Sequence, residues 1–163
     1  MKSTALLIID VQRGYINKYT EKIPKLAEQK QLEYDLVWIA RLEYGKNSPL
    51  ITIRSKNGMK DIKNPEDLAF TPIPGSNIIV KHGYSAATPE LLNALQKHNI
   101  TQIDLMGVDT DQCVLATSLA LFDLEITPRV LADYCASTRG EQMHEAGLMV
   151  MRHALGKQNI VES

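Results

Sequence analysis

The chain has few residues that could cross-link it or bind a metal. Its 163 residues include two cysteines, Cys113 and Cys135, and four histidines. Two cysteines cannot form the disulfide framework of a small secreted domain, and their separation does not match a metal site. His144 and His153 lie in one predicted helix but are nine residues apart, so they do not share one face as an i,i+4 pair does. The fold must therefore rest on its apolar core.

Long apolar runs and an excess of one charge are also missing. The first apolar run, Ala5–Ile9, is too short for a signal peptide or a membrane span. The 18 basic and 19 acidic side chains give a net charge of -1, and no basic stripe is present that could bind a phosphate backbone. The lysine-containing segment Lys56–Lys63 is predicted to be a solvated loop. We expect a cytoplasmic protein with no membrane or nucleic-acid partner.

What is present is an alternation of two hydrophobic patterns in a chain long enough for one domain, residues 1–163. Short apolar runs predict strands that are covered on both faces. These runs are Ala5–Ile9, Leu50–Ile53, Ile78–Val80, Ile103–Met106, Val130–Ala132 and an edge strand at Gln158–Val161. Helical patterns occupy Pro24–Leu42, the segment after Thr88–Pro89, Gln112–Leu124 and Gly140–Leu155. The alternation predicts an α/β fold, a doubly wound and mostly parallel sheet of five or six strands with helices on both faces.

Polar residues at the ends of predicted strands mark where a site should lie. In a doubly wound sheet, ligands bind beyond the carboxyl ends of the strands. Asp10 ends the first strand, Lys81 ends the strand at Ile78–Val80, and Cys113 follows the strand at Ile103–Met106. Asp10 alone could cap a turn and Lys81 alone could be a solvated strand end. Their common placement predicts a shared site.

Cys113 falls in the first turn of a predicted helix, just after Gly107 lets the chain turn. The positive helix end and its unpaired N–H groups favour a thiolate, which is the nucleophilic form of cysteine. The same N–H groups could hold the oxyanion of a carbonyl under attack. A buried, inert packing role is the alternative for Cys113. For Cys135 we prefer that packing role.

Taken in order, these segments resemble the isochorismatase-like cysteine hydrolases, a superfamily of isochorismatases, nicotinamidases and N-carbamoyl amide hydrolases. The matching segments are Leu6–Gln12, Val80–Lys81 with Tyr84–Ala86, Gly107–Thr110 with Cys113–Val114, and Asp133–Ser137. They keep the family's order and span nearly the whole chain. The resemblance implies the Rossmann-like, isochorismatase-type form of the predicted fold.

The resemblance implies a triad of Asp10, Lys81 and Cys113. Asp10 would take the thiol proton, Lys81 would favour the charged forms, and Cys113 would form a thioester with a small amide or ureido substrate. The backbone N–H groups of Asp109 and Cys113 would form the oxyanion hole, and a cis peptide bond would precede Asp109. The residues expected to contact the substrate are Gln12, Tyr15, Tyr84 and Val108.

The chain departs from the family pattern in two places. Nicotinamidase-type members bind a metal through an Asp-x-His pattern, and this chain has Ile53–Gly58 there without histidine. We therefore predict no metal and no cofactor. Many relatives have Ser-Ala-Phe after the lysine, whereas Ser85–Ala87 lacks the aromatic residue. We expect a homo-oligomer, in which a neighbouring subunit could complete a small or open site.

Three other functions remain open at this stage. The same fold could hydrolyse an isochorismate-like vinyl ether, although that reaction has less need of a nucleophilic thiol. A non-catalytic member could bind a small molecule, but it would have no reason to keep a carboxylate, an ammonium and a thiol together. A thiol-redox protein is disfavoured because the sequence has no Cys-x-x-Cys pair.

Overall fold

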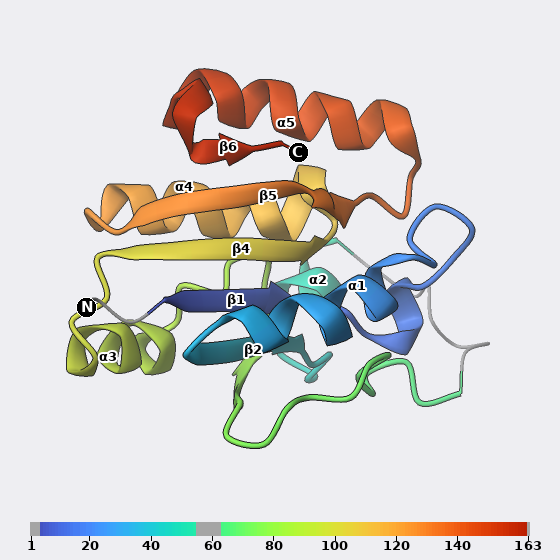
Figure 1. The fold of residues 1–163 in the computed structure, drawn as a ribbon. Helices are drawn as coiled ribbons and strands as arrows, with labels where there is room; N and C mark the ends of the chain where they lie inside the picture. Colours follow the sequence, from blue (N-terminus) through green and yellow to red (C-terminus); the bar gives the residue numbers. More distant parts are fainter. Residues whose placement is uncertain (1–3, 55–62, 163) are drawn as a thin grey trace.

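The structure, a computed structural model, describes residues 4–54 and 63–162, and its centre is a six-stranded sheet (Figure 1). All the strand pairs are parallel, and the order across the sheet is β3-β2-β1-β4-β5-β6. The strands are β1 (Ala5–Ile9), β2 (Leu36–Leu42), β3 (Asn77–Lys81), β4 (Gln102–Val108), β5 (Thr127–Ala136) and β6 (Ile160–Val161). The predicted doubly wound α/β fold is confirmed.

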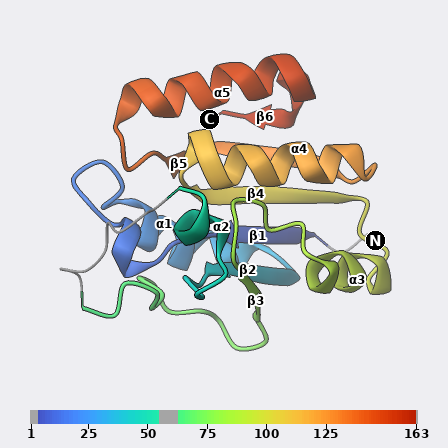
Figure 2. The same cartoon turned by 180° about the vertical axis from the view of Figure 1, so that it is seen from behind.

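Helices cover both faces of the sheet. The longer helices are α1 (Ile23–Lys30), α3 (Pro89–Lys97), α4 (Leu115–Asp123) and α5 (Glu141–Leu155). Helices α3, α4 and α5 contribute to one apolar cluster, and α1 packs into the other with the segment around Phe70. Figures 1 and 2 show α1 on the opposite side of the sheet from α3 and α4. Continuous burial of β1, from Ala5 to Ile9, agrees with a strand covered on both faces.

Two of the predicted elements are wrong. The helix predicted at Pro24–Leu42 is α1 followed by the short 3-10 helix η2 (Gln31–Glu33) and then strand β2. Trp38, which the pattern placed in that helix, lies buried in β2. The strand predicted at Leu50–Ile53 is the one-turn helix α2 (Pro49–Thr52). The Ser48 side chain caps α2 by accepting a hydrogen bond from the Leu50 N–H, and proline at the first position favours a helix start.

The topology places the switch in strand order between β1 and β4. From β1 the chain moves outward through β2 to β3, and it then returns to build β4, β5 and β6 on the other side of β1. The connections that follow β1 and β4 lead away in opposite directions, which leaves a crevice at the carboxyl ends of these two strands. Asp10 and Cys113 follow these two strands.

No helix among residues 4–54 and 63–162 is long and apolar enough to cross a membrane. The predicted loop at Lys56–Lys63 lies outside the described residues except for Lys63. Cytoplasmic location, homo-oligomerisation and the single-domain boundaries at 1–163 stay predictions.

Candidate active site

Asp10, Lys81 and Cys113 come from three different elements and meet beyond the sheet. The Lys81 Nζ lies 2.9 Å from the Asp10 Oδ2 and donates a hydrogen bond of 3.4 Å to the Cys113 Sγ. The Asp10 carboxylate also lies close enough to the Cys113 thiol to affect its pKa. Asp10 directly follows β1, Lys81 is the last residue of β3, and Cys113 lies in the π-helical turn η3 (Thr110–Val114) before α4. The three residues predicted to act together are therefore in contact.

The ammonium of Lys81 is held in place by backbone groups as well as by the triad. It donates hydrogen bonds of 2.8 Å to the Gly83 carbonyl and 3.0 Å to the Tyr84 carbonyl. Lys81 and Asp10 are each 1% exposed, so the ion pair is removed from water. A buried charge is tolerated when it is paired, as both charges are here, and the Lys81 ammonium is hydrogen-bonded as well.

Burial affects the pKa of each of the three groups. Burial raises the pKa of Asp10 above its ordinary value, although the charge of Lys81 opposes the shift. Burial disfavours the charged form of Lys81, but Asp10 and Cys113 together raise the pKa of Lys81. Burial and the negative charge of Asp10 raise the pKa of Cys113 well above that of an ordinary thiol. This direction opposes the thiolate expected from the helix end, so the nucleophile needs a base.

The strand that leads to Cys113 approaches β1 very closely at Gly107. A Cβ added at Gly107 would lie 2.1 Å from the Ile9 carbonyl oxygen, and its φ of +128° is also unfavourable for other residues. The peptide bond between Val108 and Asp109 is cis, as the resemblance implied. A side chain at position 107 would push apart the two strands that carry Asp10 and Cys113.

Helix α5 supports the turn that carries Cys113 from outside. The hydroxyl of Thr110 and the Nδ1 of His144 form a buried hydrogen bond of 2.7 Å. One turn further along α5, a Cβ added at Gly147 would come within 2.9 Å of the Asp111 backbone. Glycine at this position lets α5 pack directly against η3. The position of Cys113 therefore depends on α5 as well as on β4.

The carboxylate of Asp109 ties η3 to the loop after β5. Its two oxygens accept hydrogen bonds of 2.7 Å from the Thr138 N–H and from the Thr138 hydroxyl. The Gln112 amide donates a further hydrogen bond of 3.4 Å to it. The backbone carbonyl of Asp109 accepts from the N–H groups of Gln112 and Val114. The oxyanion hole expected at the N–H groups of Asp109 and Cys113 stays a prediction.

A small cavity opens onto the triad. It is lined by Asp10, Tyr15, Leu42, Leu50, Tyr84, Val108, Asp109, Gln112 and Cys113. The structure thus brings Tyr15, Tyr84 and Val108 to the cavity, as predicted, and their contact with substrate stays a prediction. The free volume is about 10 Å³, room for roughly one water molecule. A substrate can enter only if side chains at its mouth move.

Gln12 is not among the residues that line this cavity, and the substrate contact predicted for it stays a prediction. Its side chain donates to the carbonyls of Leu42 and Glu66, at 2.9 and 3.0 Å, and accepts from the Leu42 N–H at 2.8 Å. With 1% exposure, Gln12 holds the end of β2 and the segment around Glu66 against the end of β1.

Sequence reasoning missed four residues near the triad. Leu42, Leu50 and Gln112 line the cavity, and the Tyr44 hydroxyl is hydrogen-bonded to that of Tyr15. The Ser48–Pro49 helix start was the signal that could have placed Leu50 correctly. Two further aromatic residues pack away from the cavity on opposite faces of the sheet, Trp38 in one core cluster and the partly buried Tyr134 against the other.

The prediction of no metal concerned the segment Ile53–Gly58, of which residues 55–58 lie outside the described part of the chain. Among the described residues, one group has ligand atoms close enough together to hold an ion, and it consists of Glu141, His144 and Glu145 on α5. None of these three lines the cavity at Cys113. The site described here consists of a thiol, a carboxylate and an ammonium.

The sequence itself decides the family. The family model of the isochorismatase domain matches residues 4–159, nearly the whole chain. The chain belongs to the isochorismatase family. No curated protein matches the sequence. The chain is therefore a member of a hydrolase family, in agreement with the resemblance found in its motifs.

Solved structures of this family have the same fold. A pyrazinamidase/nicotinamidase from Streptococcus mutans has a TM-score of 0.81 at 20% identity, over 94% of this chain and 98% of the other. The pyrazinamidase of Pyrococcus horikoshii, in complex with zinc, has a TM-score of 0.81 at 18% identity, over 94% and 96%. An isochorismatase-like hydrolase from Alkaliphilus metalliredigens has a TM-score of 0.79 at 21% identity, over 93% and 92%. At these sequence identities, the likeness shows a shared fold alone.

Proposed function

We propose that this isochorismatase-like chain hydrolyses a C–N bond of a small amide or ureido compound, with Cys113 as nucleophile. The observation that carries the proposal is the ammonium of Lys81, 2.9 Å from the Asp10 carboxylate and 3.4 Å from the Cys113 sulfur. A buried thiol beside a base and a cation is the arrangement needed for nucleophilic catalysis. The nicotinamidases among the similar structures support amide hydrolysis.

In the first half of the reaction, Asp10 accepts the proton of the Cys113 thiol while the sulfur attacks the carbonyl carbon. The tetrahedral oxyanion is stabilised by the N–H groups of Asp109 and Cys113. When the C–N bond breaks, Asp10 returns the proton to the leaving nitrogen, which departs as ammonia or an amine. Because the pKa of Asp10 is raised by burial, its carboxylate is a better proton acceptor than an exposed aspartate.

The second half reverses these roles with water. Asp10 removes a proton from water, whose oxygen attacks the thioester carbon, and the proton passes to the sulfur as the C–S bond breaks. The carboxylic acid is released and Cys113 is again a thiol. Lys81 keeps its proton throughout, because Asp10 and Cys113 raise its pKa. Its function is to stabilise the negative charge that moves between these two groups.

The walls of the cavity differ in polarity. Leu42, Leu50 and Val108 supply an apolar wall, and Gln112 supplies a polar one. A small amide or ureido group can place its apolar part against the first wall and its polar part against the second.

The test is a panel of short amides and ureido compounds, with release of ammonia as the readout. Wild type should turn over members of the panel, and brief incubation followed by mass spectrometry of the intact protein should reveal an acyl adduct. Cys113→Ser should lose both signals. Cys135→Ala is the matched control, because Cys135 is a second buried thiol that does not line the cavity.

The three outcomes of this test differ clearly. Loss of activity in Cys113→Ser with retention in Cys135→Ala supports the thioester route. Turnover that survives Cys113→Ser, or hydrolysis of vinyl ethers in place of amides, would exclude it. A protein that binds panel members without releasing ammonia would be a non-catalytic member of the family.

A further inference from the structure

One guanidinium bridges two side chains that line the cavity at Cys113. The Arg54 Nη1 donates to the Tyr84 hydroxyl at 3.2 Å and to the Gln112 Oε1 at 3.4 Å. Tyr84 and Gln112 line the cavity and come from different parts of the chain, one after β3 and one in η3. A ligand that reaches Cys113 past these side chains must break or share both hydrogen bonds.

The backbone of Arg54 is fixed by the one-turn helix α2. Its N–H donates to the Pro49 carbonyl at 3.1 Å, and the Ser48 hydroxyl at the start of α2 donates to the His82 carbonyl at 2.6 Å. His82 directly follows Lys81 in the sequence. The element that carries Arg54 is therefore attached to the segment that carries the triad lysine.

The charge of Arg54 has no acidic partner among the residues that the structure describes. Its guanidinium forms no ion pair with any of them, and its side chain is exposed. The two carboxylates that line the cavity are engaged elsewhere, because Asp10 is paired with Lys81 and both oxygens of Asp109 accept hydrogen bonds from Thr138. The positive charge of Arg54 also acts to lower the pKa of Tyr44, whose hydroxyl is hydrogen-bonded to that of Tyr15.

We propose that Arg54 selects substrates whose small amide or ureido group carries a carboxylate, which the guanidinium binds as the scissile carbonyl reaches Cys113. This inference rests on the proposed function, since it specifies the substrate of the same site. A neutral substrate would only replace the hydrogen bonds from Arg54 to Tyr84 and Gln112 with other hydrogen bonds to neutral acceptors, which are of similar strength. A carboxylate replaces them with charge-assisted ones, which are stronger and can be bidentate.

Two alkylating reagents test the charge preference without any need for turnover. Iodoacetate and iodoacetamide attack a thiol through the same carbon and differ in their charge. The quantity measured is the rate of modification of Cys113 by iodoacetate divided by the rate by iodoacetamide, read from the modified peptide. Because both reagents react with the same thiolate, this ratio does not depend on the fraction of thiolate present. In Arg54→Gln this ratio should fall about fivefold at low salt, as expected for one charge about 4 Å away in water. The difference should shrink at about 1 M salt, where the screening length is about 3 Å.

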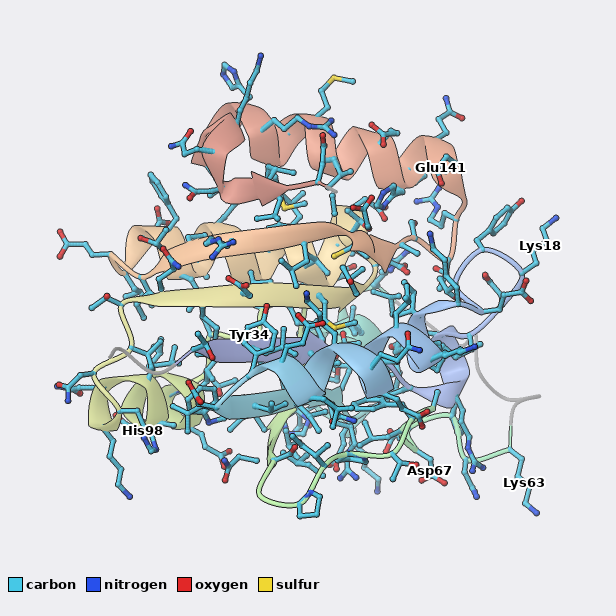
Figure 3. The ribbon with its side chains drawn as sticks, viewed as in Figure 1. Lys18, Tyr34, Lys63, Asp67, His98 and Glu141 are labelled. Carbon is cyan, nitrogen blue, oxygen red and sulfur yellow. The ribbon has the colours of Figure 1, made fainter. Side chains whose placement is uncertain are left out.

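Two controls separate a local effect from a general one. Arg54→Lys keeps the charge and should keep most of the ratio. Lys97→Gln removes an exposed cation beside His98, at the end of the sheet away from the carboxyl ends of the strands (Figure 3). It should leave the ratio unchanged. An equal fall in Lys97→Gln would mean that net charge, and not Arg54, sets the preference.

Substrate pairs of the same shape give the second measurement. Oxamate and isobutyramide, malonamate and 3-methylbutanamide, and succinamate and 4-methylpentanamide each differ by a carboxylate against an isopropyl group. Wild type should prefer the carboxylate of at least one pair by kcat/KM, and Arg54→Gln should lose about 10- to 100-fold of that preference. Unchanged ratios in both assays, with Cys113 still alkylated by iodoacetamide, would overturn the role of Arg54 and leave the nucleophile intact. A Cys113 that neither reagent modifies would overturn both proposals.

Discussion

Lys81 and Asp10 form a buried ion pair, and Lys81→Met removes its cation while keeping a side chain of similar length. Both groups are 1% exposed, so the remaining carboxylate would be buried without a partner. Breaking such a pair costs about 3–5 kcal/mol of folding free energy. The carbonyls of Gly83 and Tyr84 would also lose their donor. We therefore expect Lys81→Met to lower the free energy of unfolding by about 5 kcal/mol, near the upper end of this range.

The loss should depend on pH. Without the Lys81 charge that opposes it, burial raises the pKa of Asp10 still further above its ordinary value of 3.8. A group whose pKa is higher in the folded state favours folding most at low pH, and this contribution is lost as the pH rises through the folded-state value. The deficit of Lys81→Met should therefore be smallest near about pH 4 and larger at about pH 7.

Urea unfolding followed by circular dichroism measures this loss directly. The double variant Asp10→Asn with Lys81→Met replaces both charges with neutral side chains of similar shape and should recover most of the stability. A single variant as stable as wild type, or a double variant no better than the single, would refute the account of a coupled buried pair.

Two further substitutions test the packing that positions the nucleophile. Gly107→Ala combines a steric clash with Ile9 and an unfavourable φ, so it should cost about 4 kcal/mol in urea unfolding. Gly75→Ala, where φ is also positive but nothing lies within 4 Å, should cost only about 1 kcal/mol, and equal losses would exclude the clash. Thr110→Val leaves His144 without its buried partner and should lower both stability, by about 1–3 kcal/mol, and amide turnover. Wild-type stability and turnover in that variant would show that α5 does not support the Cys113 turn.

The elements predicted correctly are those with a strong local signal. Strand β1 is a continuous apolar run, and α3 begins with a threonine cap and a proline. Strand β2 was missed because Leu36–Leu42 follows a helix with no glycine or proline between them, so the hydrophobic pattern runs on without a break. The β-branched residues of Leu50–Ile53 suggested a strand, whereas the Ser48 cap makes the segment a helix.

The site could be predicted in part for a similar reason. Asp10 and Cys113 follow strands and Lys81 ends one, and parallel strands bring their carboxyl ends to one edge. The hydrogen bonds of Gln12 depend on backbone groups at Leu42 and Glu66, which are distant in the sequence. The raised pKa of Cys113 depends on burial and on the carboxylate beside it, and both arise only from the tertiary structure.

The most direct test of the central claim compares alkylation and turnover in wild type and Asp10→Asn across a range of pH. The negative charge of Asp10 raises the pKa of Cys113, so its removal should shift the iodoacetamide alkylation midpoint to lower pH. Amide turnover should nevertheless fall about 100- to 10,000-fold, because the base that deprotonates the thiol and activates water is gone. An unshifted midpoint, or turnover that survives the substitution, would contradict the assignment of Asp10 as the base for Cys113.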